Sequence, residues 1–269
     1  MIRNAVVAGA FYPGRKDSLL KEVRALIGRE CGKEDAIGIL SPHAGYMYSG
    51  HVAGRVFAAI KPKSTYIIMG PNHTGLGGPF GIETSSTWKT PLGEAEVDGL
   101  LSDRIKKNCK YIKDDILSHA HEHSIEVQLP FLQFLQRAFR FVPITISYAS
   151  LEIYRQIGVA IAKSIKDLKL EGAVTIIASS DMTHYESQDS AQKKDQAAID
   201  AMLELDEEKL IKRVEELGIT MCGSGPAAIM IAASKSLGAR SARLVKYETS
   251  GEASGDYSSV VGYAGIVIT

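Results

Sequence analysis

The sequence predicts an α/β protein, in which helices flank a central mixed sheet to form a single three-layer domain over residues 1–269. Short runs rich in Val, Ile and Thr alternate with longer amphipathic segments, and this alternation is typical of a sheet covered by helices on both faces. No repeat, low-complexity tract or Pro/Ser-rich linker divides the chain. One domain is therefore expected.

Five apolar runs have the length and composition of buried strands. They are "AIGILSP" (36–42), "STYIIMGP" (64–71), "FRFVPITIS" (139–147), "AVTIIASS" (173–180) and "VVGYAGIVI" (260–268). Between them, apolar residues recur at helical spacing. These segments are 15–30, 51–60, 124–139, 151–168 and 225–238, with a further charged helix expected over roughly 192–217.

The composition favours a cytoplasmic protein that binds neither nucleic acid nor membrane. Lys plus Arg and Asp plus Glu number 31 each, so no excess of positive charge marks an anionic partner. The N-terminus has no apolar run and cleavage site of a secretory signal, and no apolar stretch reaches the roughly 20 residues that span a bilayer. Three cysteines are too few for a disulfide framework.

Histidines follow several of the expected strands, and sheets of this class place their sites beyond the carboxyl ends of strands. His43 follows the first strand, His73 follows the second, and Asp181 and His184 follow the run at 173–180. A lone loop histidine is commonly just solvated or hydrogen-bonded. Together at one edge, His43 and His73 make a reasonable pair of metal ligands, because neutral imidazole suits Fe, Zn, Cu and Ni.

The segment "HAHEH" places His119, His121 and His123 two residues apart. Residues at this spacing do not share a helix face, but in an extended segment their side chains would point the same way. A solvated loop is the alternative. Glu122 and Glu126 are expected to orient imidazoles or to favour the first turn of the following helix.

Cys222 lies a few residues before a helix in which Pro226 suits the first turn. Peptide N–H groups near a helix start stabilise a thiolate and lower its pKa, although a buried, unreactive cysteine fits equally. Cys31 and Cys109 lie among charged residues, and we expect them to be exposed and without a role.

Asp181 and His184 are spaced to form a carboxylate–imidazole pair of the kind used in general acid–base chemistry. Asp181 could equally serve as the N-cap of the next helix. Tyr46 and Tyr48 offer phenolic donors or simply pack. The sequence contains no G-x-S-x-G elbow, no Walker phosphate loop and no complete G-x-G-x-x-G motif.

Five motifs, in this order, resemble the Memo family over roughly residues 3–269. They are "SPHAGYMYSG", "GPNH", "HEHSIEVQLPFL", "SSDMTHY" and "CGSGP". The resemblance is to the microbial members, of the AmmeMemoRadiSam system protein B type, and it implies the fold of class III extradiol dioxygenases. In the human member tryptophan stands where this chain has Phe11, so its phosphotyrosine-peptide binding is not carried over.

The resemblance also implies a metal, iron as Fe(II) or copper, held by His43, His73 and Cys222. It places His184 where the dioxygenases keep an acid–base histidine, and it matches Asp181, His123 and Tyr48 to other pocket residues. In this interpretation "SPHAGYMYSGH" is the first ligand loop, and His51 is an ordinary histidine at the start of a helix. The implied partners are a radical-SAM protein and an AMMECR-family protein.

Three functions remain open. The first is a metal-dependent oxidoreductase that uses O2 or a related oxidant on an unknown small molecule. The second is a non-catalytic module that uses the same pocket to bind a peptide or partner. The third is a thiol hydrolase with Cys222 as nucleophile and His184 as base, which leaves His43 and His73 unexplained.

Overall fold

The computed structural model describes residues 1–28, 33–136 and 138–269. Its centre is a run of four parallel strands, ordered β8-β3-β9-β2, with β12 antiparallel to β2. These strands are β2 (Gly38–Ser41), β3 (Thr65–Pro71), β8 (Arg140–Ile146), β9 (Val174–Ser179) and β12 (Val260–Ile268). All five strands expected from the sequence are therefore present, and the α/β class with a mixed sheet is confirmed.

Seven shorter or peripheral strands, which the sequence analysis does not identify, complete a sheet of 12 strands in the described part of the chain. They are β1 (Ile2–Arg3), β4 (Phe80–Ile82), β5 (Thr87–Thr90), β6 (Gly93–Val97), β7 (Lys113–Asp114), β10 (His184–Glu186) and β11 (Ala242–Thr249). Several are only two or three residues long, and such runs carry no measurable periodicity.

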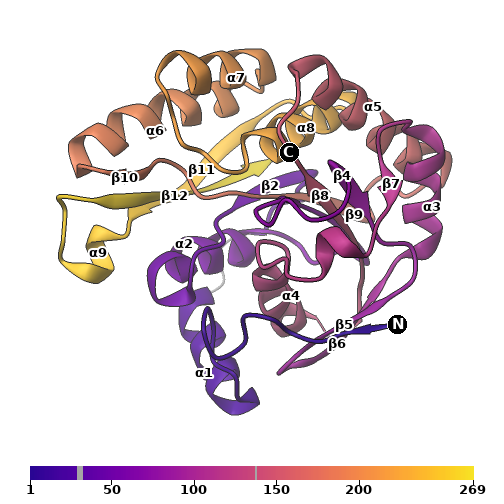
Figure 1. Cartoon of the computed structure of the whole chain (residues 1–269), viewed down its shortest axis with the longest axis horizontal. Coiled ribbons are helices and arrows are strands. Elements are labelled where there is room, and N and C mark those ends of the chain that lie inside the picture. The colour runs from indigo at the N-terminus through magenta and orange to yellow at the C-terminus, as the bar shows by residue number, and fades with distance from the viewer. Residues whose placement is uncertain (29–32, 137) are drawn as a thin grey trace.

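Helices cover both faces of the sheet (Figure 1). One face carries α3 (Gly99–Asn108), α5 (Leu151–Asp167), α6 (Gln188–Leu203), α7 (Glu207–Glu216) and α8 (Ser224–Ser236). The other carries α1 (Lys16–Ile27), α2 (Tyr46–Ala59) and α4 (Leu129–Leu135), while α9 (Gly251–Ser254) is a short turn beside β12. Along β3, Ile67 and Met69 pack into the first core and Tyr66 and Ile68 into the second, as side-chain alternation requires.

Two helices in the structure begin and end at residues other than those expected from the sequence. The charged segment 192–217 is not one helix but the pair α6 and α7. The break falls where Leu205 adopts a left-handed φ of 56° and Asp206 accepts a hydrogen bond from the Lys209 N–H as N-cap. The helix expected over 124–139 is mainly α4, preceded by a 3₁₀ turn at Glu126–Gln128; Arg137 lies outside the described residues.

Helix α2 begins at Tyr46, so it starts inside the segment expected to be a loop. Tyr48 consequently lies in the first turn, and His51 lies within the helix and not at its start. The expectation that Cys109 is exposed is wrong, because only 3% of its surface is accessible; Cys31 lies outside the described residues. Within the described ranges, no helix has both the length and the apolar character to cross a bilayer.

Candidate metal centre

The side chains of His43, His73 and Cys222 converge at the carboxyl edge of the parallel strands. One nitrogen from each histidine and the cysteine sulfur all lie within 4.8 Å of one another. His43 Nε2 and Cys222 Sγ lie 3.3 Å apart. Donors bound to one metal at 2.0–2.3 Å sit roughly 3–4 Å from each other, so a metal would draw these atoms together by only about an ångström.

The topology explains why residues so distant in sequence meet. Strand β9 lies between β3 and β2, and all three run in parallel. The loop after β2 carries His43 and the loop after β3 carries His73, so both leave the sheet on the same edge. Cys222 comes to this edge because it lies two residues before α8, which packs on β2 and β9.

Buried hydrogen bonds determine which nitrogen of His43 carries its proton. The Ser179 hydroxyl donates its one hydrogen to the carbonyl oxygen of Ser124, 2.7 Å away. It accepts from Gln128 Nε2 at 2.9 Å and lies 3.0 Å from His43 Nδ1. Because Ser179 has no second hydrogen, His43 Nδ1 must be the donor. His43 Nε2 then carries the lone pair, directed at Cys222, as a metal ligand requires.

Asp181 supports His43 and does not pair with His184. Its Oδ1 accepts a hydrogen bond from the His43 backbone N–H at 2.7 Å, and its Oδ2 lies 3.9 Å from His43 Nε2. Burial raises the pKa of Asp181 to about 6. The N-cap of α6 is Ser187, so the N-cap alternative for Asp181 is also wrong. The segment after β9 runs beside the end of β2, where the Ser180 N–H donates to the Ser41 carbonyl oxygen at 3.0 Å, and this places Asp181 next to the His43 loop.

His184 has a different partner. Its Nδ1 lies 2.9 Å from the carbonyl oxygen of Thr220, which only accepts, so Nδ1 carries the proton. The His184 backbone N–H donates to the Thr220 hydroxyl at 2.7 Å. His184 Nε2 makes no hydrogen bond with a described residue, and His184 lines the cavity.

The "HAHEH" segment forms tight turns and is not extended, so its histidines diverge. His123 stacks on His73, with ring centroids 4.8 Å apart and planes 10° apart. His119 is fully buried, where its Nε2 meets the Gly81 carbonyl oxygen at 3.2 Å, whereas His121 is exposed. A Cβ on Gly70 of β3 would overlap the Ser124 hydroxyl, so this glycine lets the segment approach the sheet closely.

Glu122 and Glu126 both act at this turn, but not by orienting imidazoles. Glu122 accepts from the Ser124 hydroxyl at 2.7 Å and from the Ile125 N–H, and burial raises its pKa to about 7. Glu126 accepts from Arg3, from the N–H groups at positions 6 and 7 and from the Tyr12 hydroxyl. It thereby fixes the N-terminal segment that carries Phe11 to within 5.1 Å of the His123 ring.

The Cys222 thiol has a raised pKa, which fits the alternative of a buried cysteine and not that of a thiolate stabilised by the helix start. Burial, and then the negative charge of Asp181, raise its pKa to about 12. Cys222 lies outside α8, where it gains little from the helix N–H groups, and its sulfur faces the Asp181 carbonyl oxygen at 3.7 Å. A bound metal ion would lower the pKa of the Cys222 thiol, because a thiol that coordinates a metal is deprotonated.

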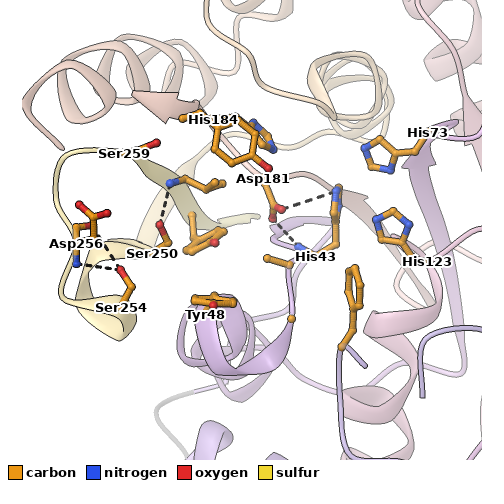
Figure 2. Close-up of a pocket in the computed structure, with 16 residues that line it drawn as sticks. His43, Tyr48, His73, His123, Asp181, His184, Ser250, Ser254, Asp256 and Ser259 are labelled. Carbon is orange, nitrogen blue, oxygen red and sulfur yellow. Dashed lines mark hydrogen bonds and ion pairs between the residues drawn. The ribbon is translucent and has the colours of Figure 1, made fainter. Parts of the chain in front are cut away.

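A cavity of about 630 Å³ opens from the cluster toward the surface. Figure 2 shows His43, His73 and His123 along one side of it, with Asp181, His184 and Tyr48 around the centre. All four of the non-ligand residues named from the sequence, His184, Asp181, His123 and Tyr48, line this cavity.

The sequence analysis does not identify Ser179 or Gln128, which support His43, nor the residues that close the far side of the cavity. Those on the far side are Ser250, Ser254, Asp256 and Ser259, and Tyr263 also lines the cavity. The sequence signals for Ser179 and Gln128 are their places in the motifs, Ser179 as the first residue of "SSDMTHY" and Gln128 within "HEHSIEVQLPFL". The segment 250–259 carries no chemical motif at all.

Fold and site together define an α/β protein in which two histidines and one cysteine converge at the strand ends beside a histidine-lined cavity. A family described as "Memo-like protein" matches residues 3–267. MEMO1 family proteins of Methanopyrus kandleri and Methanosarcina barkeri are each 43% identical to this chain, with at least 99% of both chains aligned. The relative from Methanococcus maripaludis is 44% identical over the full length of both chains. The chain belongs to the Memo family.

Proposed function

We propose that His43, His73 and Cys222 bind one redox-active metal ion, Fe(II) or copper, and that the protein is an oxidoreductase related to non-haem iron dioxygenases. The observation that carries the proposal is the convergence of two imidazole nitrogens and one thiol sulfur within 4.8 Å. Imidazole suits iron and copper, and the thiolate favours the softer copper states. The His43 hydrogen bond to Ser179 leaves the ligating nitrogen unprotonated, which supports this donor set.

Three protein ligands leave at least one coordination position for water, O2 or substrate, which is the arrangement of catalytic metals. Bound there, the metal would supply one-electron chemistry with oxygen. The remaining residues have separate tasks. Asp181 holds the His43 loop, His184 Nε2 accepts or returns a proton on the cavity side, and His123 with Phe11 closes the wall beside His73.

A non-catalytic module that binds a peptide or partner in the same cavity is the second candidate. The thiol hydrolase is disfavoured, because the Cys222 sulfur contacts His43 and not His184, and because the pKa of its thiol is raised. By the same family resemblance, we propose a radical-SAM protein and an AMMECR-family protein as partners.

The test is to purify the protein without oxygen, determine its metal content, load it with Fe(II) or Cu(I), and follow oxygen consumption. Wild type is compared with Cys222→Ser and His43→Ala, and Cys109→Ala serves as a buried-cysteine control outside the site. Oxygen uptake that needs His43 and Cys222 but not Cys109 supports the oxidoreductase. A wild type that binds metal but consumes no more oxygen than the variants, with reductants and candidate partners present, supports the binding module.

A further inference from the structure

The cavity is much larger than a metal site needs. Its volume of about 630 Å³ lies within the roughly 300–1,000 Å³ typical of ligand pockets, whereas one water takes up only about 30 Å³. Figure 2 places His43 and His73 toward one end and Ser254, Asp256 and Ser259 at the opposite end. Most of the space is therefore available to an organic ligand that spans the two ends.

The charges around the cavity are of one sign. Among the described residues that line it there is no Lys or Arg, but there are two carboxylates, Asp181 and Asp256. Asp181 is already used to support His43, which leaves Asp256 as the charge that a ligand meets at the outer end.

Asp256 is ionised and has no cationic partner in the described part of the chain. Its Oδ1 accepts from the Ser258 N–H at 2.8 Å and from the Ser258 hydroxyl at 2.6 Å, and these hydrogen bonds lower its pKa. Its other oxygen, Oδ2, forms no ion pair with any described residue, and Asp256 lies in an exposed segment. A carboxylate at a cavity wall without a partner is suited to bind a positively charged group.

The loop that presents Asp256 is held in place by its own contacts. The Asp256 N–H donates to the Ser254 hydroxyl at 3.1 Å, and Gly255 takes the left-handed φ of 74° that ends α9. The Val261 N–H donates to the Ser250 hydroxyl at 3.0 Å, which ties the loop to β12. A loop that is already ordered loses less conformational entropy when a ligand binds, so binding is more favourable.

Aromatic side chains form the walls between the two ends. Tyr48, Tyr185 and Tyr263 all line the cavity. Tyr185 adopts a left-handed φ of 59° while 79% of its surface is exposed. A non-glycine residue in this region is uncommon and clusters at ligand sites, and aromatic faces attract both planar groups and cations.

We propose that the outer half of the cavity is a subsite for the protonated amine of a small aromatic ligand, with Asp256 as its ion-pair partner and tyrosine rings along its body. If this ligand is also the substrate, that role rests on the proposed function. The amine-binding site itself does not depend on it. Anionic ligands, including phosphorylated tyrosine, meet the Asp256 carboxylate and no Lys or Arg among the described lining residues, and they are disfavoured.

The experiment uses metal-free full-length protein and three phenols of similar shape that differ in charge. They are tyramine (cation), 4-ethylphenol (neutral) and 3-(4-hydroxyphenyl)propionate (anion). Binding is measured by NMR titration or calorimetry. Tyramine is expected to bind ~3- to 10-fold more tightly than 4-ethylphenol, and the anion most weakly, with the differences shrinking as salt is added.

Asp256→Asn should abolish the preference for tyramine, and Asp256→Lys should reverse it in favour of the anion. Asp189→Asn makes the same charge change on α6 outside the cavity and should leave the order intact. Equal binding of cation and anion by wild type, an unchanged order in Asp256→Asn, or no binding of any probe at its solubility limit would overturn the proposal. Metal content is measured separately, so a protein that binds amines but no metal would refute only the proposed function.

Discussion

His43 Nδ1 lies 3.0 Å from the Ser179 hydroxyl, and the direction of this hydrogen bond is fixed by the other contacts of the serine. Ser179→Ala removes the acceptor, so His43 is no longer held in the tautomer that directs the Nε2 lone pair at the metal position. Metal affinity should fall about 10- to 100-fold. In the metal-free protein, ¹⁵N NMR of the imidazole should show protonation shifting away from Nδ1.

Ser164→Ala is the matched control for this change. Ser164 is buried in α5, donates to the Ala160 carbonyl oxygen at 2.7 Å and accepts from Asn108 Nδ2 at 2.9 Å, which is the pattern of Ser179 without the histidine. Both variants should lose about 1–3 kcal/mol of stability. If Ser164→Ala weakens metal binding as much as Ser179→Ala does, the effect is one of stability alone.

Metal binding should release a proton from Cys222. The thiol is protonated at neutral pH because its pKa is raised to about 12, whereas the two histidine ligands are already neutral. Loading at pH 7 should therefore release about one proton per metal, and affinity should rise with pH. Calorimetry in buffers of different ionisation enthalpy measures the release. Cys222→Ser should release none, and equal release from this variant would exclude the thiol as the source.

His184→Ala should spare metal binding and remove proton transfer. Its Nδ1 is held by the Thr220 carbonyl oxygen, and its Nε2 is not among the three converging ligand atoms. Metal content should match wild type, while any oxygen-dependent turnover falls by about 10²- to 10⁴-fold. His51→Ala, an exposed histidine on α2, is the control and should change neither. Loss of metal from His184→Ala would make His184 a ligand instead.

Glu122 should make the metal-free protein less stable as pH rises from about 4.5 to 7. Burial raises its folded-state pKa to about 7, above the ordinary 4.5, so in this window the folded protein binds a proton that the unfolded chain has released. The free energy of unfolding then falls by up to ~1.4 kcal/mol per pH unit. Glu122→Gln should flatten this slope in urea denaturation measured at several pH values. An unchanged slope would show that Glu122 titrates normally.

The sequence determined the layered class and the order of the central strands along the chain. Uninterrupted apolar runs such as "STYIIMGP" fit only a sheet buried on both faces, and the amphipathic segments between them had to cover it. It also indicated that His43, His73 and Asp181 would meet, because parallel strands end at one edge. The first inference depends on the local pattern of apolar residues, and the second on the rule that sites in such sheets lie beyond the carboxyl ends of the strands.

Only the tertiary structure decided the contacts within the site. Whether Asp181 supports His43 or His184 depends on how the segment after β9 lies beside the end of β2. The pKa of Cys222 depends on burial beside Asp181 more than on the helix that follows. Ser179 and Gln128 lie within quoted motifs, but nothing in the sequence shows that their side chains meet His43, and Asp256 lies outside every motif. Hydrogen-bond direction, desolvation and charge depend on distances of a few ångströms between segments that only folding brings together.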